Sequence, residues 1–206
     1  MIRDRNIDWL RQKRVIPYSD FNPVVSDATN LKGIGAGAPG VAEVSTFGFA
    51  GFACTPNDDF ATLDLQTPSI VDPTKEIGVR VIYTIDETPA ADDAVLWIVL
   101  YDQVDDNEAM VAPATALDTT IASALDGGTT GRILRRSTRG VINANKFDFT
   151  ARQGALAWSV EDQATTQYTN DKVVFLGLEI DYIPLLCASA YEDTNVFADL
   201  TVSAGV

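Results

Sequence analysis

The sequence predicts an all-β fold, an antiparallel β-sandwich of the jelly-roll type that is preceded by an extended N-terminal arm. Composition is the first reason: the 206 residues include 22 Asp and 20 Thr, but only 7 Glu and 5 Lys. Asp favours turns and Thr favours strands, whereas Glu and Lys would favour helices. The second reason is that apolar residues recur at every second position in several segments. The third is that turn sequences, without βαβ alternation, separate these segments.

Alternation is clearest in residues 76–86, 155–161 and 173–182. Residues 95–101 are apolar on both faces, which indicates a central strand covered on both sides. Residues 41–54, 60–66, 118–125 and 146–150 complete a set of about eight strands. The side chains that we expect to face the core are Ile77, Val79, Val81, Tyr83 and Ile85, then Leu156, Trp158 and Val160, and finally Val174, Leu176, Leu178, Ile180 and Tyr182.

Three regions follow from this pattern: an arm with a Gly-rich linker at residues 1–40, a sandwich body at 41–183 and a C-terminal extension at 184–206. Within the arm, the charge order of residues 7–15 predicts a short helix. Residues 35–40 match G-x-G-x-x-G, but Pro39 opposes the helix that a dinucleotide site needs, so we interpret them as linker.

The composition argues against an enzyme. The chain has no histidine, which excludes Ser-His-Asp and Cys-His nucleophile systems and His-bearing zinc sites. Paired acids such as Asp105 and Asp106 lack the alternating calcium-loop pattern, so solvated turns are favoured over a calcium site or a glycosidase pair. Cys54 and Cys187 have small apolar neighbours and are expected to be buried thiols, with a single disulfide as the less favoured alternative. We therefore assign no catalytic residue, metal or cofactor.

Positive charge is concentrated in two segments. The formal net charge is −14, yet residues 1–14 carry +3 and residues 132–139 carry +4, which leaves −21 for the rest. Such patches predict docking on acidic protein surfaces, with solvated arginines as the alternative. Nucleic acid is disfavoured, because the acidic body would repel phosphate. The predicted partner-binding residues are Arg3, Arg5, Trp9, Arg11, Arg14, Tyr18, Arg132, Arg135, Arg136 and Arg139.

We expect neither a membrane span nor a secretory signal. The longest apolar run, residues 94–101, is too short to cross a bilayer. Residues 1–14 have no apolar signal core. Synthesis in a cytoplasm is therefore expected.

The strand sequences resemble those of small β-sandwich virion proteins of tailed bacteriophages. The resemblance covers residues 76–182 and rests on Val79-Arg80-Val81-Ile82-Tyr83, on residues 94–101, on Leu156-Ala157-Trp158-Ser159-Val160 and on residues 174–182. It implies a capsid decoration (cement) protein on the virion surface, made in the host cytoplasm, that binds the major capsid protein and itself, as a homotrimer. The alternatives are a tail, neck or fibre-base protein, or a carbohydrate-binding sandwich, which would need exposed aromatic residues or calcium.

Overall fold

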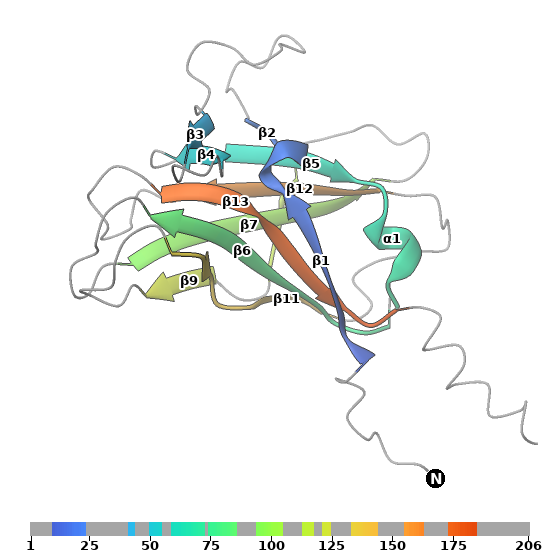
Figure 1. Cartoon of the computed structure of the whole chain (residues 1–206). Helices are drawn as coiled ribbons and strands as arrows, with labels where there is room; N and C mark the ends of the chain where they lie inside the picture. The colour runs from blue at the N-terminus through green and yellow to red at the C-terminus, as the bar shows by residue number, and fades with distance from the viewer. Residues whose placement is uncertain are drawn as a thin grey trace, which may run out of the picture.

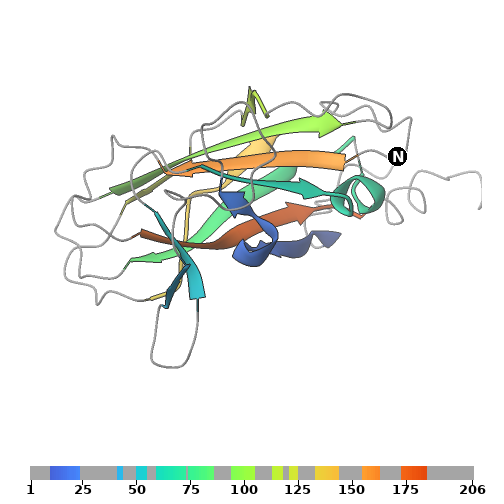
Figure 2. The ribbon, with the colours of Figure 1, turned by 90° about the horizontal axis from the view of Figure 1, so that it is seen from above.

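Two antiparallel sheets pack face to face in the computed structural model (Figures 1 and 2). It describes residues 10–23, 41–43, 50–54, 59–72, 74–85, 94–104, 113–117, 121–124, 133–143, 155–162 and 173–184. The seven-stranded sheet contains β1 (Gln12–Pro17), β3 (Val41–Glu43), β4 (Ala50–Cys54), β6 (Ile77–Ile85), β10 (Arg135–Arg136), β11 (Gly140–Ile142) and β13 (Val173–Tyr182). The six-stranded sheet contains β2 (Asn22–Pro23), β5 (Asp59–Asp64), β7 (Ala94–Val104), β8 (Thr115–Ala116), β9 (Ile121–Ala124) and β12 (Ala155–Asp162). Two short helical turns, η2 (Tyr18–Asp20) and α1 (Thr67–Ile70), flank β1 and β5.

The strand order is that of a jelly roll. From β4 to β7 the chain changes sheet at every step, and it changes again from β12 to β13. The late strand β13 lies between β4 and β6, while β12 lies between β5 and β7. Insertion of late strands between early ones is the signature of two nested Greek keys. The predicted all-β sandwich is therefore confirmed.

The core lies between the sheets and is rich in aromatic side chains. The five residues predicted to point inward from β6 are each at most 1% exposed, and Trp97 and Trp158 are equally buried. Phe60 stacks between Phe52 and Phe175, with ring centroids 5.1 Å apart on both sides. Burial of each such side chain contributes about 1.5–3 kcal/mol. Cys54 is also buried, whereas Cys187 lies outside the described residues.

Two inward-facing predictions are wrong. The register of β13 shifts between Phe175 and Gly177, so Phe175 joins the core cluster, whereas Val174 is buried outside that cluster and Leu176 is partly exposed. A β-bulge adds one residue and reverses the alternation on one side of it. In β7, Leu96, Ile98 and Leu100 remain partly exposed on the outer face, so this strand is not fully covered on both sides.

Residues 10–23 do not form an arm outside the core, and no helix spans 10–15. Instead, β1 pairs with the half of β13 that β4 leaves uncovered, and β2 pairs with β5. Ile16 and Phe21, each 2% exposed, anchor the segment in the core. The chain thus crosses from one sheet to the other within twelve residues, from Gln12 to Pro23. Residues 1–9 and 24–40 lie outside the described part.

Candidate functional site

Charged side chains gather on the outer face of the seven-stranded sheet, where β1, β13 and β6 lie side by side. In the register, Lys13 faces Asp181, and Arg80 faces Glu179. Directly opposed residues of neighbouring strands share one face of a sheet. We call the following eight residues the ion-pair cluster: Arg11, Lys13, Glu76, Arg80, Arg136, Arg139, Glu179 and Asp181. With five cations and three carboxylates, its net charge is +2.

Asp181 forms the most connected part of the cluster. Arg139 approaches it with Nε and Nη2, each 2.8 Å from a carboxylate oxygen. Arg11 Nη1 lies 2.9 Å from Oδ1, and Arg80 Nη1 lies 3.3 Å from Oδ2. Glu76 Oε1 lies 2.9 Å from Arg11 Nη2 and 3.0 Å from Arg139 Nη1, and so joins these two cations. A two-pronged arginine contact fixes orientation as well as distance.

Glu179 is the second buried anion. Lys13 Nζ lies 3.1 Å from Oε1, and Arg136 Nε lies 2.9 Å from Oε2. The side chain of Glu179 is 3% exposed, whereas those of Lys13 and Arg136 are 61% and 46% exposed. The cations therefore cover the carboxylate and keep part of their own surface in solvent, as long basic side chains commonly do.

The cluster keeps the carboxylates of Glu179 and Asp181 ionised. Burial by itself raises the pKa of Glu179, but the hydrogen bonds and charges of Lys13 and Arg136 outweigh it, so the pKa lies below its ordinary value. For Asp181, burial is likewise outweighed, first by Arg139, and the pKa is lowered. The hydrogen bond to Asp181 in turn raises the pKa of Arg139. All three groups are charged at neutral pH.

A second ion pair joins the two sheets. Arg14, on β1, places Nη1 2.5 Å from Oδ1 of Asp64, at the end of β5, and 2.7 Å from Oγ1 of Thr67. The backbone N–H groups of Gln66 and Thr67 donate to the same carboxylate at 3.0 and 3.1 Å, and the Thr67 hydroxyl also contacts it. Burial raises the pKa of Asp64, yet these hydrogen bonds, led by that of Arg14, lower it overall. Asp64 thus fixes the start of α1 and one end of β1.

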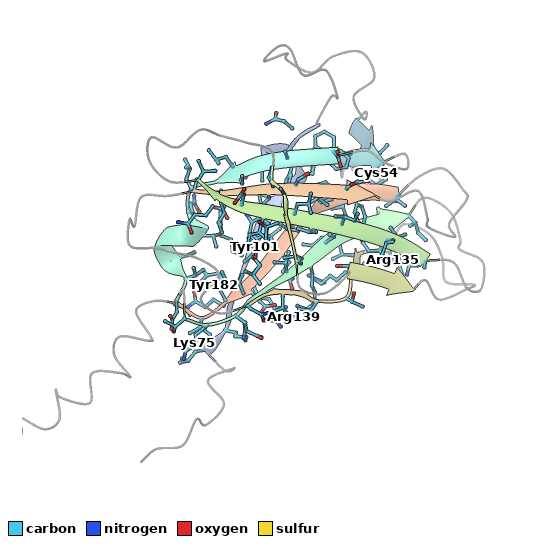
Figure 3. The ribbon with its side chains drawn as sticks, turned by 180° about the vertical axis from the view of Figure 1, so that it is seen from behind. Cys54, Lys75, Tyr101, Arg135, Arg139 and Tyr182 are labelled. Carbon is cyan, nitrogen blue, oxygen red and sulfur yellow. The ribbon has the colours of Figure 1, made fainter. Side chains whose placement is uncertain are left out.

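The structure gives several predicted partner-binding residues a contact within the chain itself. Arg11, Arg136 and Arg139 belong to the ion-pair cluster, and Arg14 binds Asp64. Whether these residues also bind another protein stays a prediction. The two basic segments, separate in the sequence, meet over β13. Figure 3 shows Arg139 toward the end of the sandwich that holds Tyr182, and Arg135 farther along.

The remaining predicted residues divide into two groups. Tyr18 packs edge-on against Phe52, with ring centroids 5.3 Å apart, so it belongs to the packing of the body. Arg135 lies opposite Tyr83 at the edge of the sheet, and among the described residues its buried Nε and Nη2 have no hydrogen-bond partner. Arg3, Arg5, Trp9 and Arg132 lie outside the described residues.

The sequence-based selection omitted the anions and two of the cations. The predicted site residues do not include Lys13, Arg80, Glu76, Glu179 or Asp181. One signal was available in the sequence. A strand with acidic residues at alternate positions and apolar residues between them has one apolar face and one acidic face. If other strands pair with both of its edges, these acidic side chains need basic neighbours.

The described part of the chain shows no site of another kind. It contains no group of three His, Cys, Asp or Glu side chains arranged to hold a metal ion. The Phe, Trp and Tyr side chains that the structure describes are buried or partly buried, and none of them is exposed. No described helix is long and apolar enough to cross a membrane. Comparison with family models and with curated proteins found no match for the chain.

Proposed function

We propose that the protein is a non-enzymatic virion component, a decoration (cement) protein that binds the major capsid protein of a bacteriophage head. Jelly rolls recur in viral capsid proteins and in lectins, and the strand sequences resemble phage virion proteins. Fold alone does not fix function. The lectin alternative receives no support from the described residues, because their aromatic side chains offer no exposed platform for a sugar.

The observation that carries the proposal is that the chain enters and leaves the sandwich at one end. Gln12, at the start of β1, pairs with Tyr182, at the end of β13. The described chain therefore enters β1 and leaves β13 at the same end of the sandwich (Figure 1). The ion-pair cluster and the Arg14–Asp64 pair hold β1 at this end. A sandwich that the chain enters and leaves at one end is suited to docking on a surface by that end.

The composition of the two terminal segments fits a contact between proteins. Residues 1–9 contain Arg3, Arg5 and Trp9, and residues 185–206 contain Tyr191 and Phe197. Aromatic and arginine side chains dominate the binding energy of protein interfaces. Segments that bind across a junction of capsid subunits would raise the cost of separating those subunits without covalent chemistry.

The direct test uses virions of the phage that encodes the chain. We expect quantitative mass spectrometry of purified particles to find hundreds of copies per particle. Six or twelve copies would support a neck or tail position instead, and absence from particles would overturn the proposal.

A truncation then tests the chain ends. A variant that lacks residues 1–9 keeps β1 and should fold like the full chain. We expect it to co-sediment with decoration-free heads much more weakly than the full chain, with Trp9→Ala weakening binding in the same direction. Unchanged binding by a variant that lacks both 1–9 and 185–206 would contradict a contact through this end.

A further inference from the structure

The two sheets of the sandwich differ in charge. On its outer face, the described six-stranded sheet carries Asp59, Asp102 and Glu161 and no lysine or arginine. On its outer face, the described seven-stranded sheet carries Lys13, Arg80 and Arg136 against Glu179 and Asp181. The outer faces of the two sheets point in opposite directions (Figure 2). In a chain of net charge −14, the described strands therefore present one basic and one acidic face.

The acidic face has an apolar centre. Because Val95, Trp97 and Val99 of β7 enter the core, the alternate residues lie on the outer face. The aliphatic residues among them form a strip beside small residues of β12. The register places Ala157 opposite Asp102 and Glu161 opposite Ile98. Leu63, on β5 opposite Ala157, is 38% exposed. The outer-face residues are Leu96, Ile98, Leu100 and Asp102 of β7, Ala157, Ser159 and Glu161 of β12, and Asp59, Ala61 and Leu63 of β5.

The basic face offers matching chemistry. Lys13 and Arg136 keep 61% and 46% of their side chains exposed although both contact Glu179. Two aliphatic side chains on or next to this sheet are exposed as well: Val15, opposite Glu179, at 48%, and Leu134, just before β10, at 60%. Apolar contacts with charged groups at the rim are the usual composition of a protein interface.

We propose that the outer face of the six-stranded sheet binds the outer face of the seven-stranded sheet of a second copy of this chain. Opposite charges then meet, whereas two six-stranded sheets in contact would bring Asp102 and Glu161 of both copies together. The contact is heterologous, and because the two faces point in opposite directions it repeats from copy to copy. Assemblies therefore grow head to tail, with a trimer as one step of the series. This inference does not depend on the proposed function.

Charge reversal tests the contact. In sedimentation velocity, the average mass of the full chain should rise with concentration. Asp102→Lys and Glu161→Lys should each weaken association about tenfold or more, because like charges then face each other. Asp20→Lys changes the net charge equally, but on the exposed η2 turn between the sheets, and should leave association unchanged. A full chain that is monomeric throughout, or an equal effect of Asp20→Lys, would overturn the inference. If a charge reversal impairs folding, Glu161→Gln takes its place in the test, with a smaller expected loss of association.

A zero-length cross-link identifies the surfaces. A carbodiimide joins a lysine Nζ to a carboxylate with loss of water. Lys13 and Glu161 lie on opposite faces of one sandwich, so a link between them must join two copies, as a mixture of ¹⁴N and ¹⁵N chains would show. Links from Lys13 to Asp102 or Glu161 are expected, and their absence from associated chains would contradict the contact. A chain that associates in this way but is absent from virions would overturn only the proposed function.

Discussion

Gly78 lies directly opposite Asp181 across the β6–β13 pair, and the Arg139 guanidinium crosses the space that a side chain at position 78 would fill. A Cβ atom there would overlap Nε and Nη2 of Arg139 and Oδ2 of Asp181. The two-pronged contact of Arg139 with Asp181 therefore depends on a glycine of the neighbouring strand. Glycine is needed at position 78 because it leaves space for this side-chain pair, not because of its backbone angles.

Gly78→Ala should destabilise the protein by about 1–3 kcal/mol, because the added methyl group displaces a tightly placed ion pair. The free energy of unfolding from urea titration measures the effect. In Arg139→Ala, the obstructing guanidinium is gone, so adding Gly78→Ala should cost less than it does in the natural chain. Additive effects of the two substitutions would show that the clash is not with Arg139.

Acid should weaken the fold through Asp64, Glu179 and Asp181. The pKa of each carboxyl is lowered in the folded chain, by basic partners that outweigh burial. The unfolded chain therefore binds more protons at acidic pH, and stability rises with pH in that range. The contribution is complete above the ordinary carboxyl pKa of about 4 and is lost as the pH falls through the lowered values.

Denaturant titrations from pH 7 down to pH 2 measure this loss, which should be concentrated below about pH 4. Asp181→Asn removes one of the three groups and should make the curve of stability against pH less steep. An unchanged slope in that variant would mean that Asp181 titrates alike in the folded and unfolded chains.

Two neighbouring cations of β1 should differ in their effect on stability. Arg14 pairs with an Asp64 side chain that is 0% exposed, so Arg14→Ala leaves a buried carboxylate without its cation and should cost about 3 kcal/mol. Lys13 is 61% exposed, and Lys13→Ala should cost at most about 1 kcal/mol. Thermal unfolding compares the two variants. Asp64→Asn should recover part of the loss in the Arg14→Ala background, and a further loss there would exclude the charge explanation.

Alternation predicted the strands of the body because one face of each is apolar and the other is not. It failed for β1, where the inward face contains Arg14 as well as Ile16, so the charge order resembled that of a helix. The partners that explain Arg14 and Lys13 are Asp64 and Glu179, which are 50 and 166 positions away. Sequence proximity carries no information about such pairs, and the bulge that keeps Val174 out of the core cluster leaves no signal in the alternation either.

Gly177 should be essential for the attachment of β1. Its φ of +152° is rare for residues with a side chain, and a Cβ atom would lie 2.5 Å from the carbonyl oxygen of Ile16. Gly177→Ala should therefore push β1 away from β13 and destabilise the chain by about 1–3 kcal/mol. Hydrogen exchange followed by mass spectrometry should show faster exchange in residues 12–17, while β7 and β12, in the opposite sheet, stay protected. Equal acceleration in both sheets would instead indicate that β1 separates only when the whole sandwich unfolds.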